Sequence, residues 1–185
     1  MKNVIERLSG GRQEHIDRLV EWLRIPSIST DSRRNGDVRQ AGQWILDELS
    51  ASGFDARLDE TAGHPVCFAS WTQAADAPTV LIYGHYDVQP PEPLELWRHG
   101  AFEPTLEGEN LIARGATDDK GQVLALVRGV CGVLQEQGSL PINVKFLIEG
   151  EEEIGSPNLA PYIESHQEEL AADVAVIADC SQFGP

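Results

Sequence analysis

The sequence predicts an α/β fold of three layers, αβα, built around a largely parallel sheet. Apolar residues recur with helical spacing in several segments, the first of which contains Ile16, Leu19 and Leu23. Two other segments, 79–83 and 142–148, are mostly apolar and β-prone, which is typical of strands buried on both faces. Because the two patterns alternate along the chain, we expect parallel strands joined by helices.

The first part of the chain is predicted to hold two helices followed by two strands. The helices cover 12–24 and 37–52, and a polar loop over 27–36 joins them. Asp37 is the predicted N-cap of the second helix, and Gly53 follows that helix as a stop signal. The two predicted strands cover 54–58 and 65–71.

The second part of the chain continues the alternation after the strand at 79–83. Pro90, Pro91 and Pro93 exclude regular structure in the segment that follows this strand. The remaining predicted elements are a short strand at 111–113, a helix over 121–135 with Gly138 at its end, a strand at 142–148, a helix at 157–165 and a strand at 173–178.

Composition limits the class of protein. The 185 residues are 41% apolar, which is enough for one globular domain, and no apolar run could span a bilayer. Thirty acidic and fourteen basic residues give a formal charge of −16, which argues against a nucleic acid or an anionic membrane as partner. Residues 1–11 lack the apolar core of a signal peptide. Cys67, Cys131 and Cys180 lie in apolar contexts, so we expect reduced core thiols in a cytoplasmic protein.

Several acidic side chains and one histidine are predicted to meet at one rim of the sheet. His85, Glu152, Glu153 and Asp179 each follow a predicted strand, and Asp118 opens a predicted helix. Two carboxylates about 4 Å apart repel each other by roughly 4 kcal/mol at an effective dielectric constant near 20, and a divalent cation reverses this effect. One imidazole with several carboxylates therefore indicates a hydrolytic metal centre.

Four motifs occur in a fixed order along the chain. They are Gly84-His85-Tyr86-Asp87-Val88-Gln89-Pro90, Arg114-Gly115-Ala116-Thr117-Asp118-Asp119-Lys120-Gly121, Glu149-Gly150-Glu151-Glu152-Glu153-Ile154-Gly155-Ser156 and Val176-Ile177-Ala178-Asp179. Together they resemble the zinc aminopeptidase-like hydrolases, a family that includes aminoacylases, carnosine dipeptidases and bacterial glutamate carboxypeptidases. The ending Gln89-Pro90 resembles the dipeptidase branch more than the deacetylase branch.

The resemblance implies a zinc-peptidase-like fold and a pair of Zn²⁺ ions, or Mn²⁺ or Co²⁺ in their place. By this resemblance His85, Asp118 and Asp179 hold one metal ion. Asp118 bridges to the second ion, which Glu153 also holds. Family members also carry a cis peptide bond after the bridging aspartate, here between Asp118 and Asp119.

The same resemblance implies the reaction. A metal-activated water attacks a peptide bond of a dipeptide or small peptide, and Glu152 is the general base that passes the proton to the leaving amine. Asp87 holds the imidazole of His85 in one orientation. The expected activity is that of a metal-dependent hydrolase, a zinc metallopeptidase of the dipeptidase type.

Family members are longer than this chain. They add a late histidine for the second metal and a lid domain through which they form homodimers. The resemblance therefore implies that residues 1–185 are an incomplete metallopeptidase catalytic domain, the N-terminal part, with the C-terminal part and lid missing. One metal site is complete here, and we expect reduced or no activity from the truncated chain alone.

Two alternatives remain open from the sequence. The chain could be an inactive truncated remnant that acts only by association, or it could be a hydrolase of N-acyl amino acids. For other polar residues the ordinary structural interpretation is preferred. We expect Glu151 to be solvated, Asp119 to be structural, and Lys120 and Arg114 to brace the acidic site. His15, His64, His99 and His166 are expected at the surface without carboxylate partners.

Overall fold

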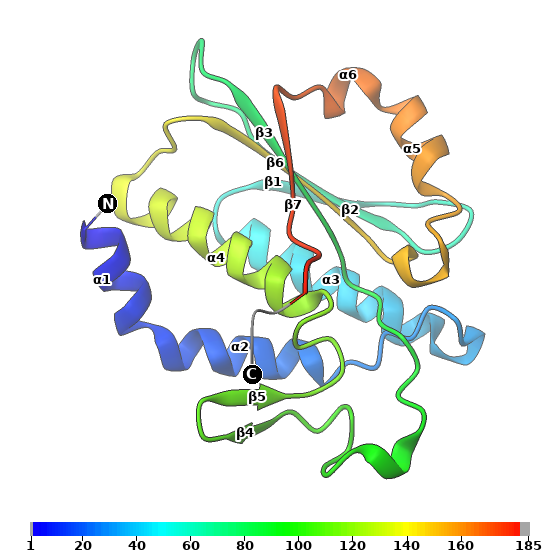
Figure 1. Ribbon diagram of the computed structural model, residues 1–185. Coiled ribbons are helices and arrows are strands. Elements are labelled where there is room, and N and C mark those ends of the chain that lie inside the picture. The colour runs from blue at the N-terminus through cyan, green and yellow to red at the C-terminus, as the bar shows by residue number, and fades with distance from the viewer. Residues whose placement is uncertain (1, 182–185) are drawn as a thin grey trace.

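The computed structural model describes residues 2–181 and contains a five-stranded sheet in the order β1-β2-β6-β3-β7 (Figure 1). β6, β3 and β7 are parallel neighbours, whereas β2 runs antiparallel to both β1 and β6. Every strand of this sheet except β2 thus points the same way, and the predicted α/β class with a largely parallel sheet is confirmed. The strands are β1 Asp55–Asp59, β2 Val66–Trp71, β3 Thr79–His85, β6 Asn143–Glu149 and β7 Val174–Ile177.

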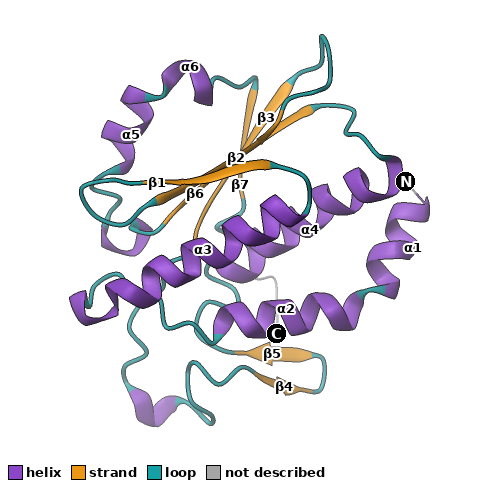
Figure 2. Ribbon diagram, turned by 180° about the vertical axis from the view of Figure 1, so that it is seen from behind, coloured by secondary structure: helices purple, strands orange, loops and turns teal. Residues whose placement is uncertain are grey.

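Helices cover both faces of the sheet, which gives the three predicted layers (Figures 1 and 2). α3 and α4 lie on one face, and α1 and α2 pack against α4 on the outside of that layer. α5 and α6 lie on the other face. The helices are α1 Lys2–Gly10, α2 Arg12–Leu23, α3 Asn35–Ala51, α4 Lys120–Gln137, α5 Leu159–Ser165 and α6 Gln167–Leu170.

Short elements lie outside this framework. β4 and β5 form a separate antiparallel hairpin, and three 3₁₀ turns interrupt the loops. No helix within residues 2–181 has the length and apolar character needed to cross a membrane. The short elements are β4 Thr105–Glu107, β5 Asn110–Ile112, η1 Ser32–Arg34, η2 Leu94–Leu96 and η3 Glu152–Ile154.

Alternate residues of the central strands enter two different cores, as the two-residue period of a strand requires. On β2, Cys67 and Ala69 join the large core beneath α3 and α4. Val66 and Phe68 join the smaller core beneath α5, which includes Tyr162. Full burial of a side chain such as Phe68 contributes about 2 kcal/mol, so both faces of the sheet hold the molecule together.

The two strands that lead to the site extend further toward their carboxyl ends than predicted. β3 includes His85 and β6 includes Glu149, and these two residues are opposite each other in the parallel register. α4 begins at Lys120, next to the predicted site residue Asp118. It ends as predicted at Gly138, whose φ of 74° is a left-handed C-cap that glycine adopts without strain.

Some local predictions are wrong. Asp37 is not the N-cap of α3, because that helix begins two residues earlier; Asp37 instead forms an ion pair with Arg34 at 3.0 Å. α1 and α6 were not predicted, and the single strand predicted at 111–113 is one arm of the β4–β5 hairpin.

β7 lies at an open edge of the sheet. Val174 and Ile177 are 52% and 60% exposed, although the strand was predicted from its apolar character. Cys180, just beyond β7, is exposed as well, so the prediction of a core thiol is wrong there, because no further strand within residues 2–181 pairs with this edge. Cys67 and Cys131 are buried, as predicted, and Cys67, Cys131 and Cys180 form no disulfide within residues 2–181.

Candidate metal centre

His85 is fixed at the end of β3 by the backbone around it. Its side chain is fully buried, and its backbone N–H donates to Oδ2 of Asp119 at 3.2 Å. The preceding residue must be small here. A Cβ on Gly84 would lie 2.4 Å from Cγ2 of Val123 and 2.7 Å from Oδ2 of Asp119. Glycine therefore lets the end of β3 approach the start of α4.

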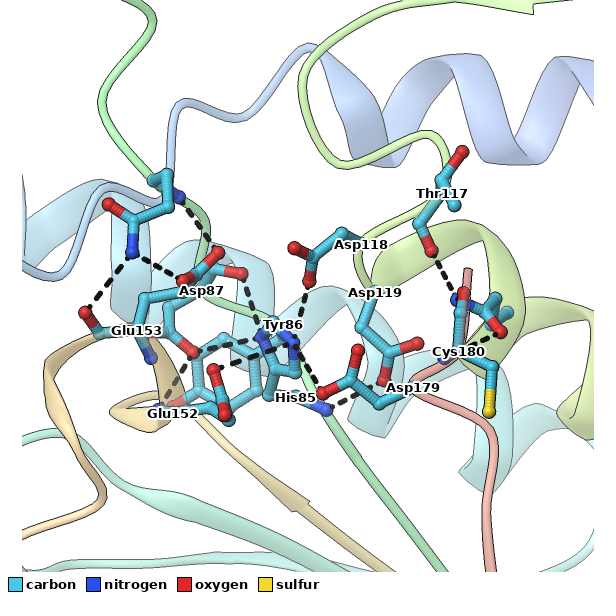
Figure 3. Close-up of polar contacts among 12 residues, drawn as sticks. His85, Tyr86, Asp87, Thr117, Asp118, Asp119, Glu152, Glu153, Asp179 and Cys180 are labelled. Carbon is cyan, nitrogen blue, oxygen red and sulfur yellow. Dashed lines mark hydrogen bonds and ion pairs between the residues drawn. The ribbon is translucent and has the colours of Figure 1, made fainter. Parts of the chain in front are cut away.

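The imidazole Nε2 of His85 faces three carboxylates from three different segments (Figure 3). Oδ1 of Asp118 lies 3.1 Å away, Oδ2 of Asp179 lies 3.9 Å away and Oε2 of Glu152 lies 4.0 Å away. One donor atom each from His85, Glu152 and Asp179 lie within 4.8 Å of one another. The convergence expected from the strand ends is therefore observed for these four residues.

Asp87 contacts the other nitrogen of the same imidazole. Its Oδ1 lies 3.3 Å from Nδ1 of His85, and its backbone carbonyl lies 3.1 Å from that nitrogen. The two carboxylate oxygens also accept the backbone N–H groups of Glu152 at 3.3 Å and Glu153 at 3.1 Å. One buried carboxylate thus connects the imidazole to the turn that carries both glutamates.

The two aspartates before α4 differ in exposure. The side chain of Asp118 is 54% exposed and contacts His85, whereas Asp119 is fully buried and occupies the N-cap position of α4. The peptide bond between them is cis, as the resemblance implied. The Oδ1 atom of Asp119 is buried and has no hydrogen-bond partner among residues 2–181.

Glu153 has a different set of contacts from Glu152. Its carboxylate accepts hydrogen bonds from the backbone N–H of Gln89 at 3.1 Å and from Nε2 of Gln89 at 2.6 Å. Sequence reasoning did not assign Gln89 a role at the site, although the residue belongs to the first motif. Its position four residues after His85 was the signal that could have pointed to it.

The electrostatics of the site favour a positive charge at its centre. Burial lowers the pKa of His85, but Asp87 and the charges of Asp119 and Asp118 outweigh it, so the pKa is raised to about 10. Burial raises the pKa of Asp119 to about 7. Burial also raises the pKa of Glu152, and the charge of Asp179 adds to the shift. Crowded carboxylates repel one another, and a cation relieves that repulsion.

The donor set fits a divalent cation. Two ligand atoms bound to one Zn²⁺ ion at about 2.1 Å lie roughly 3 to 4 Å apart. The separations of Asp118, Asp179 and Glu152 from Nε2 of His85 span 3.1 to 4.0 Å. Imidazole and carboxylate donors suit Zn²⁺, and carboxylates also suit Mn²⁺.

Two expectations about neighbouring acids and bases are corrected. Glu151 is only 4% exposed rather than solvated, because His64 N–H and Nδ2 of Asn158 donate to its carboxylate at 3.0 and 2.8 Å. Lys120 is fully buried and does not brace the acids; its Nζ donates to the carbonyls of Trp22 and Ile25.

Two other side chains also differ from expectation. Arg114 donates to the carbonyl of Pro90 at 3.1 Å and lies over the ring of Trp97, so it braces the loop after β3 rather than the acids. His99 has a carboxylate partner after all, because its Nε2 lies 3.3 Å from Glu107 on β4.

Residues 81–182, more than half of the chain, match the family model described as peptidase family M20/M25/M40. The chain belongs to this family.

Among curated M20 relatives, the chain is 37% identical over 185 residues to the Beta-Ala-His dipeptidase of Rattus norvegicus, an alignment that covers 91% of this chain. Among solved structures, it is similar to human carnosine dipeptidase 1, with a TM-score of 0.91 and 29% identity over 98% of this chain. It is also similar to an M20 family metallo-carboxypeptidase of Sulfolobus solfataricus, with a TM-score of 0.81 and 38% identity over 89% of this chain.

The chain spans well under half the length of these relatives. The alignments cover 37% of the rat dipeptidase, 41% of the human carnosine dipeptidase chain and 37% of the Sulfolobus carboxypeptidase chain. The M20 fold is thus shared over nearly all of the described residues.

Proposed function

We propose that this chain forms the metal-binding part of an M20 catalytic domain that hydrolyses the peptide bond of dipeptides or small peptides. The observation that carries the proposal is the meeting of three carboxylates around Nε2 of His85, each from a different segment. The names of the relatives, a dipeptidase and a carboxypeptidase, support a small-peptide substrate.

The metal-holding residues in this proposal are His85, Asp118 and Asp179 for one Zn²⁺ ion, and Asp118 and Glu153 for a second. When bound, such a metal lowers the pKa of a water molecule and polarises the substrate carbonyl. Mn²⁺ or Co²⁺ suits the same donors. The chain supplies a full ligand set for the first ion, and its expected activity alone is low.

Glu152 is the proposed general base. Its side chain is 37% exposed, so it reaches solvent, while its carboxylate lies 4.0 Å from Nε2 of His85. Burial and neighbouring carboxylates raise its pKa, which improves its ability to take a proton near neutral pH and to return it to a leaving amine. Asp87 fixes both the base, through the Glu152 N–H, and the imidazole of His85.

Calorimetric titration with Zn²⁺ and Mn²⁺ tests the proposed site. We expect uptake by the unmodified chain, and loss of that uptake in His85→Ala and Asp118→Asn. Asp47→Asn is the control, because Asp47 is exposed on α3, where its carboxylate accepts a hydrogen bond from Gln43. Absence of metal uptake tighter than millimolar in the unmodified chain contradicts the proposal.

Hydrolysis assays with added zinc separate the candidate functions. Turnover of simple dipeptides that Glu152→Gln abolishes supports the peptidase with Glu152 as base. Turnover of N-acyl amino acids alone favours the deacylase. Metal uptake without turnover of either substrate class favours the remnant that lacks activity on its own.

A further inference from the structure

Two buried acids beside the metal centre are not used by the proposed mechanism. Glu149 is the last residue of β6 and is 2% exposed, and Glu151 precedes η3 and is 4% exposed. An acid buried this deeply needs hydrogen-bond donors around it. Both residues have them, and the donors come from other parts of the fold.

Glu149 joins β3 to Ser156, which lies at the far end of the turn formed by residues 151–156. Its Oε1 accepts the hydroxyl of Tyr83 at 2.6 Å and the hydroxyl of Ser156 at 2.8 Å. Tyr83 is on the neighbouring strand, and Ser156 follows η3 with a left-handed φ of 50°. Both hydrogen bonds reach the same oxygen atom.

Glu151 joins the near end of the turn to two further loops. Its Oε1 accepts the backbone N–H of His64, and its Oε2 accepts Nδ2 of Asn158. The space for this carboxylate is provided by Gly63, where a Cβ would lie 1.8 Å from Oε1 of Glu151. Here the two hydrogen bonds reach different oxygen atoms.

The segment between these acids carries Glu152 and Glu153. Within the turn, the carbonyl of Glu151 accepts the N–H groups of Ile154 at 3.2 Å and Ser156 at 2.8 Å. Asp87 holds the N–H groups of Glu152 and Glu153 from the side of β3. The turn is thus attached at its start, its middle and its end.

We propose that Glu149 and Glu151 are positioning residues that fix turn 151–156, and so place Glu152 and Glu153 relative to His85. The roles of Glu152 and Glu153 in this inference rest on the proposed function. The attachment of the turn can be tested independently of that function. Asp118, Asp179 and His85 lie on other segments, so loss of these attachments affects the two metal sites unequally.

Zinc titration of Glu149→Leu and Glu151→Leu is the test. We expect the site formed by His85, Asp118 and Asp179 to keep its affinity. The site that includes Glu153 should lose affinity by about 10- to 100-fold, the range seen when residues that orient ligands are removed.

Conservative variants sharpen the test. Glu149→Gln should restore the second site, because one amide oxygen can accept both hydroxyls. Glu151→Gln should restore it only in part, because the amide nitrogen replaces one of two accepting oxygens. Glu48→Leu is the control for general destabilisation. Glu48 is also buried but pairs with Arg18 and Arg128 away from the turn.

Unchanged zinc affinity at both sites in the two leucine variants overturns the inference, and so does an equal loss in Glu48→Leu. If the unmodified chain binds zinc only at the first site, amide hydrogen exchange decides the inference by itself. It also decides the inference if the chain binds no zinc, a result that contradicts the proposed function. The N–H groups of Glu152 and Glu153 should be protected in the unmodified chain and exchange at least about tenfold faster in Glu149→Leu. Equal exchange in both proteins overturns the attachment.

Discussion

Asp87 connects the imidazole of His85 with the backbone of Glu152 and Glu153. A carboxylate on Nδ1 leaves Nε2 free to act as a donor atom for a cation, because it fixes the orientation of the ring. The buried position of Asp87 prevents water from replacing it. At the scale of residues, Asp87 therefore connects the imidazole with the turn that carries the two glutamates.

Asp87→Asn is expected to weaken zinc binding by about 10- to 100-fold. The amide removes a negative charge beside His85 and can accept at only one oxygen, so one backbone N–H of the turn loses its partner. Calorimetric titration measures the affinity, and circular dichroism checks the fold. An affinity equal to that of the unmodified chain argues against this role for Asp87.

Sequence reasoning found the residues at the centre but not those that support them. His85, Asp118, Glu152 and Asp179 follow strands or open a helix, and that position alone predicts a common rim. Glu151 was misjudged because its burial depends on His64, 87 positions away along the chain, which no local pattern reveals. The ligand and base roles themselves stay predictions.

The strands and helices place these residues through close contacts between elements. The end of β3 meets the start of α4 where Gly84 faces Val123 and Asp119. Continuous apolar runs predicted β3 and β6 well because buried strands have no polar face. The short helix α1 was missed because its pattern is brief, and its only buried residue is Val4.

Gly84→Ala is expected to lower the free energy of unfolding by about 1 to 3 kcal/mol, because the new methyl group overlaps Val123 and the carboxylate of Asp119. Gly129→Ala in α4 is the matched control. A Cβ there meets nothing within 4 Å, so this change should stabilise the helix by about 0.5 to 1 kcal/mol. Urea unfolding measures both. An unchanged free energy of unfolding in Gly84→Ala contradicts the close approach of β3 to α4.

An ionic cluster links β1 to the helices on the second face of the sheet. Asp59 accepts hydrogen bonds from Arg57 at 2.8 Å and from the hydroxyl of Tyr162 at 2.7 Å, and Arg57 also binds Glu169. Burial raises the pKa of Asp59, but the hydrogen bonds from Arg57 and Tyr162 lower it more, so the pKa is below its usual value.

This shift predicts the effect of pH on stability. Because the pKa of Asp59 is lower in the folded state, ionised Asp59 stabilises the fold above the unfolded pKa of about 3.9, and the contribution disappears as the pH falls through the folded pKa. Asp59→Asn should lower the free energy of unfolding by about 1 kcal/mol at pH 7, and by progressively less below about pH 4. Urea unfolding across this range measures it, with exposed Asp55→Asn as control. A loss of stability in Asp59→Asn that does not change with pH contradicts the lowered pKa of Asp59.

At the scale of the whole molecule, the open edge at β7 and the high net charge have opposite effects on self-association. An apolar edge strand with unpaired backbone groups favours association with another strand. The formal charge of −16 opposes association between copies until salt screens it. We therefore expect self-association to increase with ionic strength.

Val174→Lys is expected to reduce this self-association, because it places a charge on the 52%-exposed edge residue of β7. Leu96→Lys is the control. It changes the net charge equally at a 76%-exposed residue in η2, away from the sheet. Sedimentation velocity at low and high salt measures both variants. An equal effect of the two substitutions contradicts a role for the edge.

The candidate metal centre depends on the fold, because β3, the loop before α4, η3 and the segment after β7 each deliver one side chain to it. X-ray absorption of the zinc-loaded chain tests this convergence most directly. The expected spectrum shows imidazole nitrogen and carboxylate oxygen at about 2.0 to 2.1 Å and no sulfur. A sulfur shell at about 2.3 Å from the cysteines, or a spectrum without imidazole, contradicts it.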